Sequence, residues 1–281
     1  ELRHCGGFMY HITEADGHLS MERAAGGTSA GPARPGYAIT NQAIVGPLLE
    51  QMQEKNIADT IEGLTGFANR YYSSAPGIES SNWLKRKWIE LAASRDHISI
   101  EPYAHARYDQ RSVIATIAGT DKSAEVVVMG AHLDTINLLG TKDTTKAPGA
   151  DDDASGVAGL TEVLRVLAAS GYKPRRTIRL IAYAAEEVGL RGSQEIAREY
   201  KKNAVNVVGV LQLDMTNFKG SAKDIYIFTD YTDEGQNGFL ENLLKVYLTT
   251  VTVGYEKCGY GCSDHASWSA QGYATSMPFE A

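Results

Sequence analysis

Apolar residues recur at helical spacing through the first part of the chain. Two successive stretches, residues 44–52 and 57–67, place an apolar side chain at every third or fourth position, which is typical of amphipathic helices. A third amphipathic helix is predicted to start at Ser80 or Ser81 and to reach residue 91. After this helix the pattern changes, and short runs of β-branched residues become frequent.

These β-branched runs alternate with further amphipathic helices to the end of the chain. The central runs are apolar on both faces, as in the strands of a buried parallel sheet. The alternation predicts an α/β fold with a mostly parallel sheet. Strands are predicted at residues 98–103, 112–118, 125–131, 177–185, 207–213 and 224–229, and helices at residues 156–169, 190–200 and 239–248.

Composition and net charge limit the kinds of partner that the protein could bind. The chain has 281 residues, enough for a large core, and its formal net charge is −7. A negative balance argues against a nucleic-acid partner, and no apolar run has the length of a membrane-spanning helix. The run from Ala24 to Gly36 is rich in Gly, Ala and Pro, and it is interpreted as a flexible, cleavable linker.

The three cysteines do not decide whether the protein works in an oxidising or a reducing compartment. Cys5 stands alone, whereas Cys258 and Cys262 bracket a flexible Gly-Tyr-Gly run. This spacing fits a tight-loop disulfide, which would indicate an oxidising compartment. It fits two reduced thiols equally well.

An acidic turn stands out at residues 147–156, where three consecutive carboxylates, Asp151, Asp152 and Asp153, follow a Pro-Gly pair. One interpretation is a solvated turn whose last Asp caps the next helix. The other is a cation site, because a divalent ion converts repulsion between the carboxylates into coordination. The turn alone does not decide between them.

The ends of the predicted strands favour the cation. Ligands of open α/β sheets bind just beyond the carboxyl ends of the strands. The side chains at these ends are His132 and Asp134, Glu186 and Glu187, and Asp214, with the acidic turn beside them. No Lys or Arg lies within the strand ends, so a metal ion is the simplest source of positive charge.

The donor set consists of oxygen and imidazole, which suits Zn²⁺, Mn²⁺ or Co²⁺. The number of carboxylates indicates two ions that share one of them. His132 and Asp134 lie two positions apart, so Asp134 is expected to orient the imidazole. Glu186 and Glu187 point different ways, so one can bind metal while the other accepts a proton from water.

Five motifs carry a family resemblance: residues 130–134 (GAHLD), 147–156 (APGADDDASG), 184–193 (AAEEVGLRGS), 211–217 (LQLDMTN) and 258–268 (CGYGCSDHASW). Together they resemble the motifs of secreted bacterial leucyl aminopeptidases, the two-zinc exopeptidases of the Vibrio type. The resemblance extends from about Tyr37 to Ala281. It implies a single zinc-exopeptidase (phosphorylase-like) domain whose mixed, mostly parallel sheet is flanked by helices.

The resemblance also implies a role for each site residue. His132, Asp152 and Asp214 would hold one zinc ion, and Asp152 would bridge to a second, which Glu187 also binds. Glu186 would be the general base, Asp134 the partner of His132, and Cys258 and Cys262 a disulfide. Tyr260 would stabilise the oxyanion. The pocket for an apolar first side chain would be lined by Met215, Phe228, Tyr260, Met277 and Phe279.

The family takes a further zinc ligand from a His after the Met-Pro-Phe-Glu run, and here the given sequence stops at Ala281. We therefore expect a catalytic domain at residues 37–281 whose C-terminal end is incomplete, or an impaired form. Residues 1–36 resemble the end of a pro-segment. The implied enzyme is secreted and monomeric, with peptides that have a free N-terminus as substrates.

Two rival interpretations use the same residues. A carboxypeptidase, deacylase or glutaminyl cyclase could be built on the same scaffold. A non-catalytic binding module would lack several ligands, whereas this chain keeps four of the expected ligands and the base.

Overall fold

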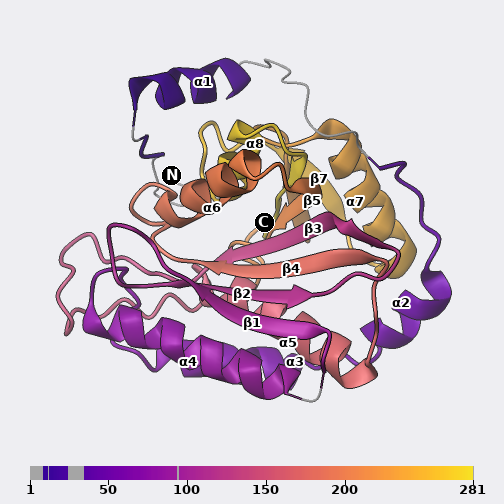
Figure 1. Ribbon diagram of the computed structural model, residues 1–281, viewed down its shortest axis with the longest axis horizontal. Helices are drawn as coiled ribbons and strands as arrows, with labels where there is room; N and C mark the ends of the chain where they lie inside the picture. Colours follow the sequence, from indigo (N-terminus) through magenta and orange to yellow (C-terminus); the bar gives the residue numbers. More distant parts are fainter. Residues whose placement is uncertain (1–8, 12, 25–34, 94, 281) are drawn as a thin grey trace.

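A six-stranded sheet forms the centre of the computed structural model, which describes residues 9–11, 13–24, 35–93 and 95–280 (Figure 1). The strand order is β1-β2-β4-β3-β5-β8, parallel from β4 to β8 and antiparallel from β1 to β4. This confirms the predicted mixed, mostly parallel sheet. The strands are β1 (Ile98–Tyr103), β2 (Ser112–Ile117), β3 (Lys122–His132), β4 (Arg176–Tyr183), β5 (Asn206–Gln212) and β8 (Thr275–Ser276).

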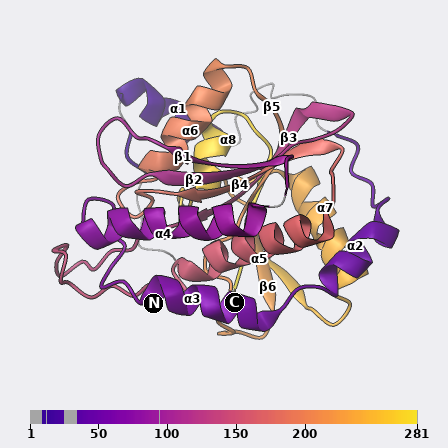
Figure 2. The ribbon, with the colours of Figure 1, turned by 60° about the horizontal axis from the view of Figure 1, so that its bottom comes forward.

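Helices cover both faces of this sheet (Figure 2). On one face, α3 (Glu54–Thr65), α4 (Ala75–Ala92) and α5 (Ala154–Ser170) bury residues such as Leu64, Trp88 and Leu164 against the strands. On the other face, Trp268 of α8 (His265–Ala270) packs with residues of α6 (Arg191–Lys202). Two further helices are α2 (Gln42–Leu49) and α7 (Glu234–Tyr247). No helix among the described residues could span a membrane.

The start of α4 differs from the prediction. The helix begins at Ala75, several residues before the predicted Ser80 or Ser81. Ser74 is its N-cap and accepts a hydrogen bond from the Gly77 N–H at 3.0 Å, and a Pro in the first turn needs no helical donor. The apolar pattern identified the helix, and the cap decided where it starts.

The predicted strand at 224–229 is present as β6 (Ile225–Phe228), but it belongs to a second, three-stranded sheet. Its neighbours are β7 (Val253–Glu256), which is parallel to it, and β9 (Pro278–Phe279), which is antiparallel. Only Met277 separates β8 from β9, so the chain passes directly from the central sheet to the small one.

Near the N-terminus the structure contains α1 (Glu14–Ala24) and a short segment before it. The N–H of Tyr10 donates to the Gly189 carbonyl at 3.0 Å, and its own carbonyl accepts from Gln194 Nε2 at 2.7 Å. This segment therefore lies against the turn between β4 and α6. Cys5 and most of the predicted linker lie outside the described residues.

Candidate active site

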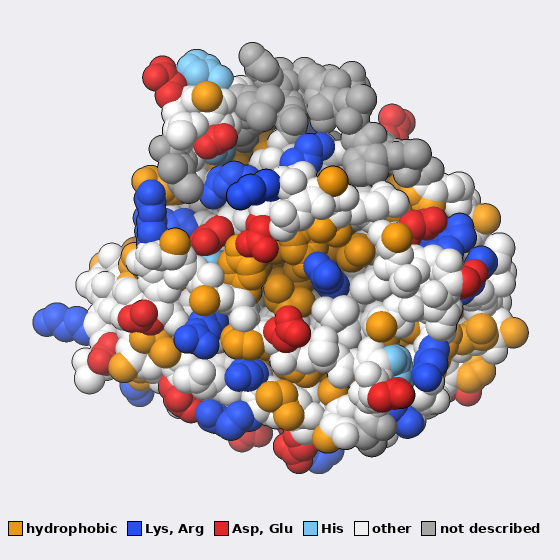
Figure 3. Space-filling model, viewed as in Figure 1, with side chains coloured by type: hydrophobic (Ala, Val, Ile, Leu, Met, Phe, Trp, Pro, Cys, Tyr) orange, Lys and Arg blue, Asp and Glu red, His pale blue; other side chains and the backbone are white. Residues whose placement is uncertain are grey.

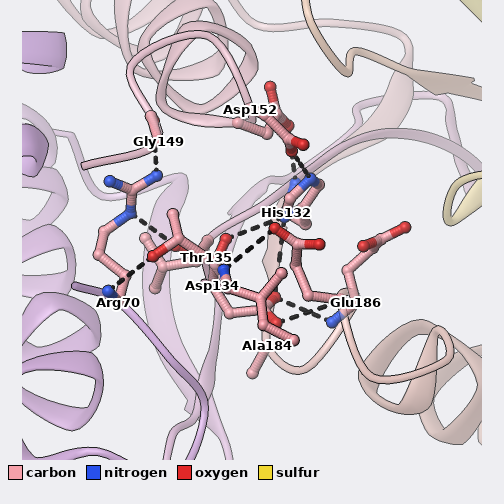
Figure 4. Close-up of polar contacts among 12 residues, drawn as sticks. Arg70, His132, Asp134, Thr135, Gly149, Asp152, Ala184 and Glu186 are labelled. Atoms are coloured by element: carbon pink, nitrogen blue, oxygen red, sulfur yellow. Dashed lines mark hydrogen bonds and ion pairs between the residues drawn. The ribbon is translucent and has the colours of Figure 1, made fainter. Parts of the chain in front are cut away.

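Three parallel strands end at one edge of the central sheet, and α5 begins beside them. β3 ends at His132, β4 is followed by Glu186 and Glu187, and β5 is followed by Asp214. The acidic turn before α5 reaches the same place, where Asp152 points toward the imidazole of β3 (Figure 4). The strand-end rule therefore located the residues that the structure brings together.

His132, Asp152 and Asp214 form a compact group. One potential ligand atom from each residue lies within 4.8 Å of the others. The distance from His132 Nε2 is 2.8 Å to Asp152 Oδ1 and 3.6 Å to Asp214 Oδ1. His132 and Asp214 are fully buried, and Asp152 is partly exposed. One imidazole and two carboxylates at these separations fit a divalent metal ion.

Acids are concentrated at this edge, whereas acidic and basic side chains are interspersed on the face shown in Figure 3. Burial raises the pKa of Asp153 and of Glu186 well above the usual range. Burial lowers the pKa of the His132 imidazole, but the surrounding carboxylates, Asp214 first, together raise it well above its usual value. Without a metal ion, protons must balance these charges, and a divalent cation can replace those protons.

His132 is oriented through its other ring nitrogen. Nδ1 lies 3.1 Å from the backbone carbonyl of Asp134 and 3.7 Å from Asp134 Oδ1. The Asp134 carboxylate instead accepts the N–H groups of Glu186 at 2.8 Å and Glu187 at 3.2 Å. Asp134 thus contacts the imidazole mainly through its main chain, and its side chain fixes the turn that carries the two glutamates.

The two glutamates have different surroundings. Glu186 is buried, and its Oε1 has no hydrogen-bond partner among the residues that the structure describes. Glu187 Oε1 accepts the N–H of Ile136 at 3.2 Å, and Glu187 lies outside the compact group of three. Burial, with Asp152 nearby, raises the pKa of Glu187 to about 9.

The other two aspartates of the acidic turn have different contacts. Asp153 is the N-cap of α5 and accepts from the Gly156 N–H at 2.9 Å, while its second oxygen accepts from the His132 N–H at 2.9 Å. Asp151 Oδ1 accepts from the Asn217 N–H at 3.1 Å. Both carboxylates are engaged by the backbone, which leaves Asp152 to face the imidazole.

Comparison with known proteins shows the family of the chain. Residues 112–280 match the family model described as Peptidase family M28. The chain belongs to peptidase family M28. Leucine aminopeptidase 1 of the fungus Pyrenophora teres f. teres is 38% identical over 260 residues, which cover 88% of this chain. The chain spans only 65% of the length of that relative.

Solved M28-like structures share the architecture. The LapA aminopeptidase of Legionella pneumophila superimposes with a TM-score of 0.81 at 36% identity, covering 87% of this chain and 65% of LapA. LapB from the same organism superimposes with a TM-score of 0.83 at 34% identity, covering 96% of this chain and 71% of LapB. The predicted fold class is therefore shared with solved relatives.

In the M28 chain, a positively charged side chain that the sequence did not reveal also lies at this edge of the sheet. Arg70, from the loop between α3 and α4, is fully buried beside the acidic turn (Figure 4). Its guanidinium donates to main-chain carbonyls of Leu133, Pro148 and Gly149. No Lys or Arg lies within the strand ends in sequence, but Arg70 reaches them from a distant loop. The residues around Arg70 in the sequence do not indicate this contact.

A second group of predicted residues lies on the small sheet. We call it the apolar cluster; it consists of Phe228, Cys258, Tyr260, Cys262, Met277 and Phe279. The two cysteines form a disulfide, which resolves the alternatives that their spacing left open. Met215 lies apart from this cluster in sequence, next to Asp214, and its carbonyl accepts from the Glu280 N–H at 3.1 Å.

Proposed function

We propose that this M28 chain is a metal-dependent aminopeptidase that hydrolyses the N-terminal residue of peptides and prefers Leu-like side chains. The observation that carries the proposal is the group of His132, Asp152 and Asp214 beside the buried carboxylate of Glu186. The name of the fungal relative supports the activity. The chain covers less than two thirds of that relative, so activity and substrate belong to the proposal.

Four residues would hold the metal, His132, Asp152 and Asp214 with Glu187, and we propose two zinc ions with Asp152 as the shared ligand. When bound, such ions polarise the scissile carbonyl and lower the pKa of water. Imidazole with carboxylates and no thiolate is a donor set that zinc accepts in catalytic sites. The 2.8 Å approach of Asp152 to the imidazole supports a ligand role for both.

Glu186 is the proposed general base. Its carboxylate would accept a proton from the attacking water and pass it to the leaving amine. Its Oε1 has no hydrogen-bond partner among the described residues and could receive that proton, and burial raises its pKa well above the usual value of a carboxyl group. The backbone N–H of Glu186 is held by Asp134, which fixes the base without occupying its oxygens.

The apolar cluster is the proposed pocket for the substrate's first side chain, together with Met215. Phe228 and Phe279 pack with ring centroids 5.2 Å apart, and Met277 is fully buried beside them. Such a surface would favour an aliphatic side chain through burial of apolar area. Tyr260, between the two cysteines, is proposed to stabilise the oxyanion.

We further propose that residues 37–281 form the catalytic domain, that residues 1–36 are a removable pro-segment or linker, and that the enzyme is a secreted monomer of the Vibrio type. The disulfide supports secretion, since disulfides persist in oxidising compartments. The sequence change at the Gly- and Pro-rich run supports the domain boundary.

Hydrolysis of Leu-p-nitroanilide, with and without a chelator, tests the proposal. We expect zinc-dependent release of p-nitroaniline and no release from the N-acetylated substrate, because an aminopeptidase needs a free amine. Activity that survives the chelator would contradict the metal, and hydrolysis of the acetylated substrate would contradict the aminopeptidase specificity.

A further inference from the structure

Arg70 joins the two segments that carry the closest candidate ligands. Its Nε donates to the Leu133 carbonyl at 2.8 Å, Nη1 to Pro148 at 2.5 Å and Nη2 to Gly149 at 2.9 Å. Leu133 directly follows the last residue of β3, and Gly149 lies three positions before the proposed shared ligand. One guanidinium therefore links the end of β3 to the acidic turn (Figure 4).

The local backbone is shaped for this contact. Gly149 has φ +51°, and a Cβ at this position would lie 2.2 Å from Thr135 Cγ2 and 3.0 Å from Arg70 Nη2. Only glycine allows so close an approach at such a φ. Thr135 adds a second link, because its Oγ1 accepts from the Arg70 N–H at 2.8 Å and donates to the Ala147 carbonyl at 3.0 Å.

The positive charge of Arg70 also compensates the buried acids around it. Asp134 and Asp153 are fully buried nearby, and neither is a candidate ligand, so a metal ion does not bind them directly. Burial lowers the pKa of Arg70 to about 10, and the surrounding acids, Asp153 first, act in the opposite direction. The guanidinium stays protonated at neutral pH. Because its hydrogen bonds go to neutral carbonyls, its positive charge compensates the neighbouring carboxylates as a group.

We propose that Arg70, with Thr135, is a positioning residue that fixes the spacing of His132 and Asp152 and thereby sets the affinity of the site for metal. We call this pair the Arg70 clamp. Arg70 acts through the main chain of the two ligand segments, since it donates to no ligand side chain. The inference rests on the proposed metal centre, and it is independent of which peptide is cleaved.

Two substitutions separate the charge of Arg70 from its shape. Arg70→Lys keeps the charge but loses the planar fork, and Arg70→Gln loses both. We expect the dissociation constants for Zn²⁺ and Co²⁺, measured by competition with a chelator, to rise about 10–100-fold in Arg70→Gln, as for other residues that orient metal ligands, and by less in Arg70→Lys. The visible spectrum of the Co²⁺-loaded protein should change with the ligand spacing.

Arg95 offers a matched control. It donates to two main-chain carbonyls at the far end of α5, Ala168 at 2.5 Å and Ala169 at 2.9 Å. Arg95→Gln should therefore leave metal affinity and the Co²⁺ spectrum unchanged. Leu164→Ala, a buried position of the same helix, calibrates the effect of lost stability alone. Wild-type metal affinity and spectrum in Arg70→Gln, with thermal stability reduced as in Leu164→Ala, would overturn the proposal.

If the Arg70 variants do not fold, two substitutions at Thr135 test the proposal instead. Thr135→Val removes the hydroxyl at nearly constant volume, and Thr135→Ser keeps it, so metal should bind more weakly to the first and normally to the second. Wild-type affinity in Thr135→Val would contradict the clamp. A wild-type chain that binds metal but cleaves no peptide contradicts the proposed function alone, and a wild-type chain that binds no metal overturns both.

Discussion

The two parts of the candidate site are stabilised in opposite ways. At the edge of the central sheet, ionisable side chains are buried together and held by backbone N–H groups, as Asp134 and Asp153 show. The apolar cluster on the small sheet is held by side-chain packing and a disulfide. In the proposed function, the first arrangement concentrates charge for hydrolysis, and the second provides an apolar surface that recognises the substrate. Substitutions in the two parts should therefore affect different steps.

The largest effect is expected at Asp152. Asp152→Ala removes the proposed shared ligand, so metal content should fall by both ions and peptidase activity should disappear. Asp151→Ala is the matched control, because Asp151 contacts the Asn217 N–H and does not face the imidazole. Metal analysis of the two purified variants gives the answer, and equal loss of metal in both would refute the assignment.

Glu186 should affect turnover without affecting metal. Glu186→Gln keeps the size of the side chain but cannot accept the proton, so kcat should fall by about 10²–10⁴-fold while metal content stays normal. Glu162→Gln is the control, because Glu162 is equally buried but pairs with Arg165 away from this edge. Near-normal turnover of Glu186→Gln would exclude Glu186 as the base.

The apolar cluster should control specificity. Phe279→Ala enlarges the proposed pocket, so the preference for Leu over Ala substrates, measured as the ratio of kcat/KM values, should fall by about 10–200-fold. Phe67→Ala is the control, since Phe67 packs against Trp83 of α4, away from the apolar cluster. An unchanged ratio in Phe279→Ala would place the pocket elsewhere.

The smallest expected effect is a pH dependence near the apolar cluster. Burial lowers the pKa of His265 to about 4, although Asp230 acts in the opposite direction. Between this value and the usual 6.5, the unfolded chain binds a proton that the folded chain does not. The free energy of unfolding should thus fall as the pH drops from 6.5 to 4, by at most about 1.4 kcal/mol per pH unit for this group.

Urea unfolding at several pH values in this range measures the slope. His265→Gln should make it shallower, whereas a change at the exposed His18 should not. Identical slopes for wild type and His265→Gln would contradict the role of burial.

The sequence predicted those elements whose signals are local. The runs that became β3, β4 and β5 have apolar, β-branched centres, and parallel strands place their ends together. His132, Asp214 and the glutamates could therefore be found from the sequence. The position of β6 could not be predicted, because its partners β7 and β9 are brought to it by tertiary packing.

Arg70 shows the same limit within the site. It lies 63 residues before Leu133 in sequence, and nothing in its neighbourhood signals that its acceptors are main-chain carbonyls. The hydrogen bonds of the Asp134 carboxylate could not be predicted for a related reason. Its spacing from His132 was visible, but its bonds to the backbone of Glu186 and Glu187 depend on how β4 ends.

The loop between β3 and the acidic turn has a consequence for how this site can vary. Thr135 Oγ1 donates to the Ala147 carbonyl at 3.0 Å, and Asn137 Nδ2 donates to the Lys146 carbonyl at 2.9 Å, so the base of the loop is closed. Leu138 and Leu139 at its tip are 85% and 98% exposed. Residues inserted at the tip would extend into solvent at a small entropic cost and leave the base unchanged. The loop is thus a place for a tag or a reporter group beside the proposed metal site.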